Sequence, residues 1–126
     1  MLGVVDVAVE TAHAQLSKNP GAMRPYEQLE WTRAEQEAWL AEQAYEGMLH
    51  AVESKTPANR DVLIGKESVA ALAESCLLRI CRVIGGGTFS RTSPFGNWFE
   101  DVRALGFLRP PWGLAYDSLF ASGFPS

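Results

Sequence analysis

Residues 81–87 read Cys-Arg-Val-Ile-Gly-Gly-Gly, residues 93–95 read Ser-Pro-Phe, and residues 100–103 read Glu-Asp-Val-Arg. This stretch predicts a long apolar helix that ends at the glycines, a turn, and a second helix that begins at the serine-proline pair. One glycine is enough to end a helix in the left-handed conformation. Three in a row also remove side chains from a longer piece of backbone, which favours close approach by another backbone or a ligand. A flexible turn is the alternative interpretation.

Apolar residues recur every three or four positions along the rest of the chain, which is typical of amphipathic helices. The stripes predict helices over residues 5–16, about 26–53 and about 58–84, a fourth from residue 93 onward, and a last helical turn or two at 114–120. The second helix contains roughly 28 residues and is about 42 Å long. No alternating strand pattern is visible. We therefore expect an all-α fold, an antiparallel four-helix up-and-down bundle that forms a single domain over residues 1–126.

The composition is that of an ordinary globular protein, with 47% apolar and 21% charged residues. A formal net charge of −4 argues against nucleic acid and anionic membrane surfaces as partners. The first residues lack the basic region of a signal peptide, and no apolar run approaches the roughly 20 residues that span a bilayer. We expect a cytoplasmic protein.

Charged residues are unevenly distributed along the chain. Residues 27–53 hold seven glutamates and a single arginine, Arg33, whereas arginines populate the last third. Such charge runs usually mark solvated faces.

The residue types show no complete active site. His13 and His50 lie on different predicted helices, and neither has a metal-type partner at helical spacing. The five-residue spacing of Cys76 and Cys81 fits neither a zinc pair nor a redox Cys-x-x-Cys motif, so we expect buried free thiols. The three glycines have no strand before them and no Gly-Lys-Ser/Thr sequence after them, so they are not a nucleotide-binding loop. We expect no metal site.

Four motifs in register resemble the C-terminal helical domain of the acyl-CoA dehydrogenase family. They are the Leu-Gly-x-x-x-x-Ala start at residues 2–8, the Arg-Pro link at 24–25, the turn at Gly85, Gly86 and Gly87, and the Ser-Pro and Asp-Val-Arg segments at 93–94 and 101–103. No single motif is specific, but together they cover nearly the whole chain.

The resemblance implies that the bundle works with an N-terminal helical domain and a middle β domain, both absent from these residues. FAD would lie between the β domain and the bundle, with Gly85, Gly86 and Gly87 as cofactor-binding residues in the complete assembly. The assembly would oxidise an acyl-CoA-type thioester. The chain would be a fragment, a split subunit or a partner of the missing flavoprotein domains. Residues 18–22 lack the arginine and phenylalanine of a phosphate contact that the family normally adds.

Arg109 stands at the position where many family members carry the catalytic glutamate. A guanidinium is always cationic and cannot abstract the substrate α-proton. We therefore expect no catalytic residue in this chain and no activity from the chain alone. Three alternatives stay open: a base supplied by another segment, membership of the flavin-dependent monooxygenase-like branch, or a degenerate partner subunit. A non-catalytic helical interaction module is the competing class.

The last 30 residues contain six phenylalanine and tryptophan side chains: Trp98, Phe99, Phe107, Trp112, Phe120 and Phe124. A small bundle cannot readily bury all of them, and exposed aromatic patches usually mark interfaces. We expect self-association to a dimer or tetramer. The alternative is a tail that folds back over the end of the bundle.

Overall fold

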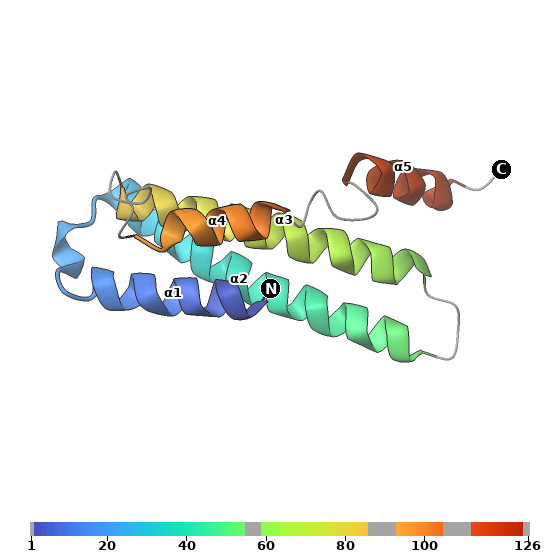
Figure 1. Ribbon diagram of the computed structural model, residues 1–126, viewed down its shortest axis with the longest axis horizontal. Coiled ribbons are helices and arrows are strands. Elements are labelled where there is room, and N and C mark those ends of the chain that lie inside the picture. The colour runs from blue at the N-terminus through green and yellow to red at the C-terminus, as the bar shows by residue number, and fades with distance from the viewer. Residues whose placement is uncertain (1, 55–58, 86–92, 105–111, 125–126) are drawn as a thin grey trace.

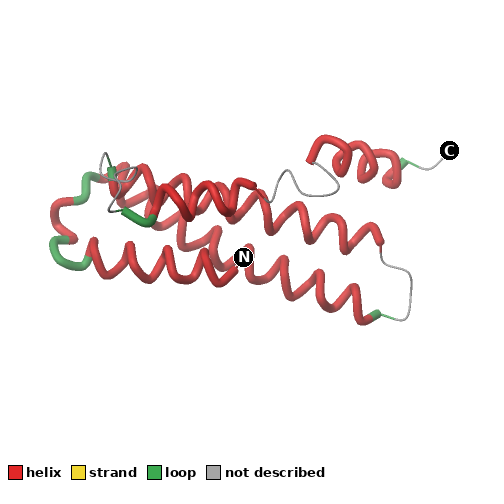
Figure 2. Tube along the Cα trace, in the orientation of Figure 1, coloured by secondary structure: helices red, strands yellow, loops and turns green. Residues whose placement is uncertain are grey.

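All regular elements in the described part of the chain are helices, which confirms the all-α prediction (Figures 1 and 2). The computed structural model describes residues 2–54, 59–85, 93–104 and 112–124. The elements are α1 (Leu2–Leu16), the 3-10 helix η1 (Pro20–Ala22), α2 (Pro25–Glu53), α3 (Asn59–Ile84), α4 (Phe95–Ala104) and α5 (Trp112–Gly123). The predicted bounds agree closely for α2 and α3. The C-terminal segment differs, because it forms a helix of 12 residues instead of a turn or two.

The antiparallel pair α2 and α3 forms the long axis of the molecule (Figure 1). Helix α2 begins at Pro25, whose fixed φ suits the first helical turn. The backbone N–H of Arg24 donates to Oε1 of Glu27 at 3.2 Å, which satisfies one free donor at this helix start. Helix α3 ends at Gly85, whose φ is +87° and whose N–H donates to the carbonyl of Cys81 at 3.0 Å. The predicted glycine stop is confirmed.

The two long helices approach each other very closely at Gly65 of α3. A Cβ atom placed there would lie 2.7 Å from Cβ of Met48 and 3.3 Å from the carbonyl oxygen of Ala44. No side chain fits into this space without moving α2 away from α3. The sequence therefore needs glycine at this position for packing.

Helices α1 and α4 cover only one half of the α2–α3 pair (Figure 1). We call this the covered half: α1, α4, residues 25–41 of α2 and residues 69–84 of α3. The extended half comprises residues 42–53 of α2 and 59–68 of α3, and α5 lies against α3 in this half. The buried core lies in the covered half and consists of Val5, Ala8, Ala12, Trp31, Ala34, Ala73, Cys76, Leu77, Ile80, Cys81, Val83, Phe95 and Val102.

The apolar stripe predicted along the whole of α2 is buried only in part. Trp31, Ala34 and Ala41 are buried, but Tyr45 is exposed and Val52 is 61% exposed. The physical reason is the length of the covering helices. Helix α1 has 15 residues and α4 has 10, against 29 in α2, so neither covers the extended half.

Candidate functional site

The glycine turn, predicted as the cofactor contact, is described only at its first residue. Gly85 is exposed, and a Cβ atom placed on it would meet no other atom within 4 Å. Its positive φ is accounted for by the end of α3, and the open space around it leaves the backbone accessible. Gly86, Gly87 and Arg109 lie outside the described residues. Both the cofactor contact and the missing catalytic base therefore stay predictions.

Charged residues from α2 and α3 meet in one network at the covered half. Nε of Arg79 lies 2.6 Å from Oε1 of Glu37, and its Nη1 lies 2.9 Å from Oε1 of Glu30. Nη1 of Arg82 lies 3.8 Å from the other oxygen of Glu30. The side chains of Arg79, Glu30 and Glu37 are each about one-fifth exposed. Burial opposes the charged form of Arg79, but its hydrogen bonds with Glu37 and Glu30 outweigh that effect and raise its pKa.

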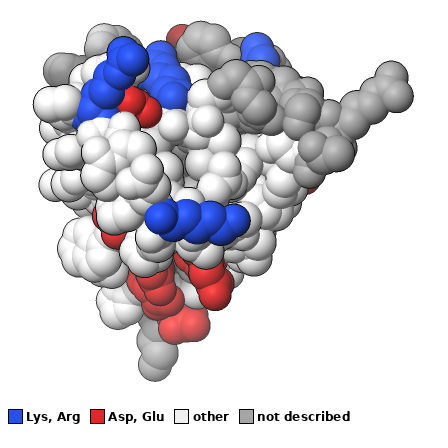
Figure 3. Space-filling model, turned by 90° about the vertical axis from the view of Figure 1, so that its left-hand side faces the viewer, with Lys and Arg blue, Asp and Glu red and all other residues white. Residues whose placement is uncertain are grey.

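The charge runs are therefore more than solvated faces, because some of their residues pair across the two helices. Part of the acidic charge of α2 is neutralised by arginines from the last turns of α3. Oε2 of Glu30 is sealed from solvent and has no hydrogen-bond partner in the described structure. Figure 3 shows this end of the molecule with basic and acidic side chains on a surface that is otherwise mostly uncharged. The network ties the two long helices together.

An open groove of about 750 Å³ runs beside this network along the outer face of α2. Arg79 and Glu37 form its charged wall, and Trp39 and Leu40 are among its apolar lining residues. Trp39 is 60% exposed and Leu40 is 45% exposed. An exposed tryptophan beside charged groups is typical of a protein interface.

Cys76 and Cys81 are buried free thiols, as predicted. Sγ of Cys76 donates to the carbonyl of Ala34 at 3.3 Å, which links α3 to α2. Burial, with a contribution from the negative charge of Glu37, raises the pKa of Cys76 to about 12, although Arg79 opposes this shift. Burial also raises the pKa of Cys81. Both are therefore protonated at neutral pH and serve packing instead of thiol chemistry.

The histidines lie apart from each other on different helices. His13 is exposed on α1, and its ring centroid lies 6.2 Å from that of Trp31. His50 is exposed in the last turn of α2. Within residues 2–54, 59–85, 93–104 and 112–124, no three histidine, cysteine, aspartate or glutamate side chains are grouped so that they could hold a metal ion. None of the described helices is long and apolar enough to cross a bilayer.

No model of a known protein family matches this sequence, and searches among curated proteins and among solved structures found no match either. The resemblance to the acyl-CoA dehydrogenase family therefore rests on the four sequence motifs alone. Sequence reasoning missed the Arg79 network, although Glu30 and Glu37 are spaced seven apart and so share one face of α2.

Proposed function

We propose that this chain is a four-helix up-and-down bundle, extended by α5, that acts as the C-terminal domain of a flavoprotein resembling the acyl-CoA dehydrogenases. In the complete assembly it contributes FAD contact and oligomerisation for oxidation of an acyl-CoA-type thioester. The observation that best supports this proposal is the position of three of the motifs at helix ends. Pro25 begins α2, Gly85 ends α3, and α4 begins directly after Ser93-Pro94.

The end of α3 supports the proposed flavin contact. Because the space next to Gly85 is open, another molecule can approach its backbone closely. The flavin itself would supply the redox chemistry, and the protein would supply binding and orientation. One helical domain offers only an edge contact to such a cofactor. The chain alone is therefore expected to be inactive, all the more since Arg109 replaces the usual glutamate.

Exposed apolar side chains support a role in association. Phe120 is 71% exposed on α5, Phe124 just after α5 is 74% exposed, and their ring centroids lie 5.0 Å apart with the rings tilted by 35°. Such patches usually mark surfaces that a partner covers. The proposal expects a dimer or tetramer in solution, or contact with the missing flavoprotein domains. Two free buried thiols also suit a reducing cytoplasm.

Self-association is tested by light scattering on the purified chain at high micromolar concentration. The expected result is a dimer or tetramer, and Phe120→Ser with Phe124→Ser should shift it toward monomer. A monodisperse monomer of the unmodified chain would contradict self-association. In that case, the exposed aromatic residues would contact the missing flavoprotein domains and not a second copy of this chain.

Flavin contact is tested by purifying the tagged chain, with whatever protein it retains, from the cells that produce it. The expected complex shows the absorbance of oxidised flavin. Gly86→Val should lower flavin retention without changing thermal stability. Gly21→Val is the matched control, because a Cβ atom at Gly21 would meet only Asn19, at 3.9 Å. Unchanged flavin retention with lower thermal stability would show that Gly86 is only structural, and complexes without flavin would contradict the proposal.

The monooxygenase-like alternative keeps the same bundle but uses the flavin differently. Anaerobic reduction of the bound flavin by an acyl-CoA thioester supports the dehydrogenase reaction. Reduction by a nicotinamide or flavin donor followed by reaction with oxygen supports the monooxygenase branch. The unmodified chain alone should do neither.

A non-catalytic helical interaction module is the second candidate, and the groove beside Trp39 favours it. This groove is lined by exposed Trp39 and Leu40 and does not depend on a flavin. The variant Trp39→Ala should weaken capture of a protein partner while the fold is retained. A stable partner that carries no flavin would favour this second candidate over the first.

A further inference from the structure

A second hollow lies between α3 and α5 in the extended half. Nη1 of Arg60, in the first turn of α3, donates to the carbonyl of Leu119 at 2.6 Å and to Oγ of Ser122 at 2.5 Å, which attaches α5 to α3. Next to this contact is a hollow of about 450 Å³. Most of its wall is apolar or aromatic, from Ile64, Tyr116, Leu119, Phe120 and Phe124. This volume falls within the range of about 300–1,000 Å³ that is usual for small-molecule sites.

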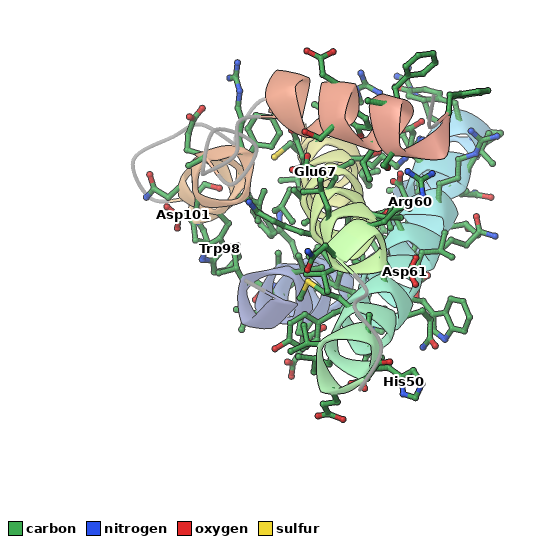
Figure 4. The ribbon with its side chains drawn as sticks, turned by 90° about the vertical axis from the view of Figure 1, so that its right-hand side faces the viewer. His50, Arg60, Asp61, Glu67, Trp98 and Asp101 are labelled. Atoms are coloured by element: carbon green, nitrogen blue, oxygen red, sulfur yellow. The ribbon has the colours of Figure 1, made fainter. Side chains whose placement is uncertain are left out.

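Glu67 lines the same hollow and is unusually buried for a carboxylate. It is only 6% exposed, and it is the one buried charged residue in the described part of the chain. It has no hydrogen bond or ion pair with any other described residue. Figure 4 shows Glu67 and Arg60 on α3, both close to α5.

Glu67 lines the hollow, and its carboxylate is not completely sealed by protein. Among the described side chains that are not exposed, the only sealed oxygen without a hydrogen-bond partner is Oε2 of Glu30. The oxygens of Glu67 are therefore not completely sealed, and the described space that this residue lines is the hollow. A carboxylate removed from bulk water without a cation or a donor is unfavourable, so buried charges in proteins are normally paired.

We propose that this hollow binds a small molecule with a positively charged amino group on an apolar body. The amino group pairs with the carboxylate of Glu67, and the body packs against Tyr116, Phe120 and Phe124. Aromatic faces around the amino group add cation–π attraction. The site is separate from the proposed flavin contact, but it shares Phe120 and Phe124 with the surface proposed for association.

Arg60 fixes the direction in which such a ligand enters. It lies seven residues before Glu67 on α3, which places it about 10 Å away along the helix axis. Its guanidinium repels an ammonium group at that end of the hollow, whereas Glu67 attracts one. The amino group is therefore directed toward Glu67. A carboxylate ligand of the same size would be repelled there.

The test is a titration of the ¹⁵N-labelled full chain with hexylammonium, hexan-1-ol and hexanoate. Binding is measured by the changes in the amide chemical shifts. Hexylammonium should give saturable shifts at residues 60–68 and 116–124. Its affinity should exceed that of hexan-1-ol by about tenfold, or about 1.4 kcal/mol, and it should also exceed that of hexanoate. No saturable shift in these two segments with hexylammonium would overturn the proposal. Equal affinities for hexylammonium and hexan-1-ol would also overturn it.

Variants separate the charge from the shape of the site. Glu67→Gln should remove the preference for hexylammonium over hexan-1-ol, whereas Glu74→Gln, a half-buried glutamate of α3 that does not line the hollow, should keep it. The Phe120→Ala variant should fold, because Phe120 is exposed. It should bind hexylammonium and hexan-1-ol with equally reduced affinity. A retained preference in Glu67→Gln would overturn the role of the carboxylate. Unchanged binding in Phe120→Ala would overturn the location.

Discussion

The two halves of the α2–α3 pair are built from the same helices but are covered very differently. In the covered half, α1 and α4 enclose fully buried side chains such as Leu77, Ile80 and Phe95. In the extended half, α5 lies against α3, and Val52 at the end of α2 is 61% exposed. The apolar pattern of α2 nevertheless continues across both halves. The extended half thus carries apolar surface that this chain does not cover, which is where the proposed association and the amine site lie.

The largest expected difference between the halves is the cost of shortening a leucine. Leu77→Ala removes a fully buried side chain and should lower the free energy of unfolding by about 2–5 kcal/mol. Leu63→Ala removes a half-buried leucine from the extended half of the same helix and should cost clearly less. Chemical denaturation of both variants measures the difference. Equal losses would show that the extended half is packed as tightly as the covered half.

The second prediction tests whether the extended half has any specific packing of its own. Gly65→Ala places a Cβ atom 2.7 Å from Cβ of Met48, so the helices must separate, at a cost of about 1–3 kcal/mol. Gly47→Ala is the matched control on the facing helix, because a Cβ atom there meets nothing within 4 Å. That change should stabilise the helix by up to about 1 kcal/mol. If both variants changed the free energy of unfolding in the same direction, α2 and α3 would be only loosely packed against each other in this half.

The helices themselves could be predicted from the sequence because their signals are local. The Arg-Pro pair at the start of α2 and the glycine at the end of α3 lie next to the residues whose backbone they control. The apolar spacing of residues 69–84 likewise predicts the buried face of α3. Helix α5 was predicted too short.

The differences between the two halves could not be predicted, because they depend on contacts between distant residues. Whether Val52 is buried depends on how far α1 and α4 reach along α2, and no pattern around Val52 records that length. Glu67 would be classed as exposed from its type alone; the hollow that it lines includes residues of α5. The partners of Arg79 are 42 and 49 residues away in the sequence. The cofactor contact at Gly86 and Gly87 is still a prediction.

The third prediction concerns the charges that tie α2 to α3 in the covered half. Arg79→Met keeps most of the side-chain volume but leaves Glu30 and Glu37 facing each other without their shared guanidinium. Because these groups are partly exposed, the expected loss is only about 1 kcal/mol, and it should shrink as salt is added. Arg103→Met is the control, since Arg103 makes only an exposed contact of 4.0 Å with Glu100. If the loss of stability in Arg79→Met did not depend on salt, it would come from lost side-chain packing and not from lost charge pairing.

The last effect is absent at neutral pH and appears only in alkali. Burial raises the pKa of Cys76 to about 12 in the folded state, above the value of 9.0 for a free thiol. The folded state therefore favours the protonated thiol, whose contribution is complete below pH 9 and is lost as the pH rises from 9 toward 12. Above pH 9 the unfolded chain ionises first, so the free energy of unfolding should fall by up to about 1.4 kcal/mol per pH unit. Cys76→Ala should flatten this slope.

Alkylation of the folded chain provides an independent measurement of the same burial. The thiolate is the reactive form, and the Sγ proton of Cys76 is also donated to the carbonyl of Ala34, so iodoacetamide at pH 8 should label Cys76 very slowly. Rapid labelling, at the rate of an unfolded control, would mean that the covered half opens easily. The two halves would then differ in the arrangement of their helices but not in stability, because solvent would reach the packed residues of both.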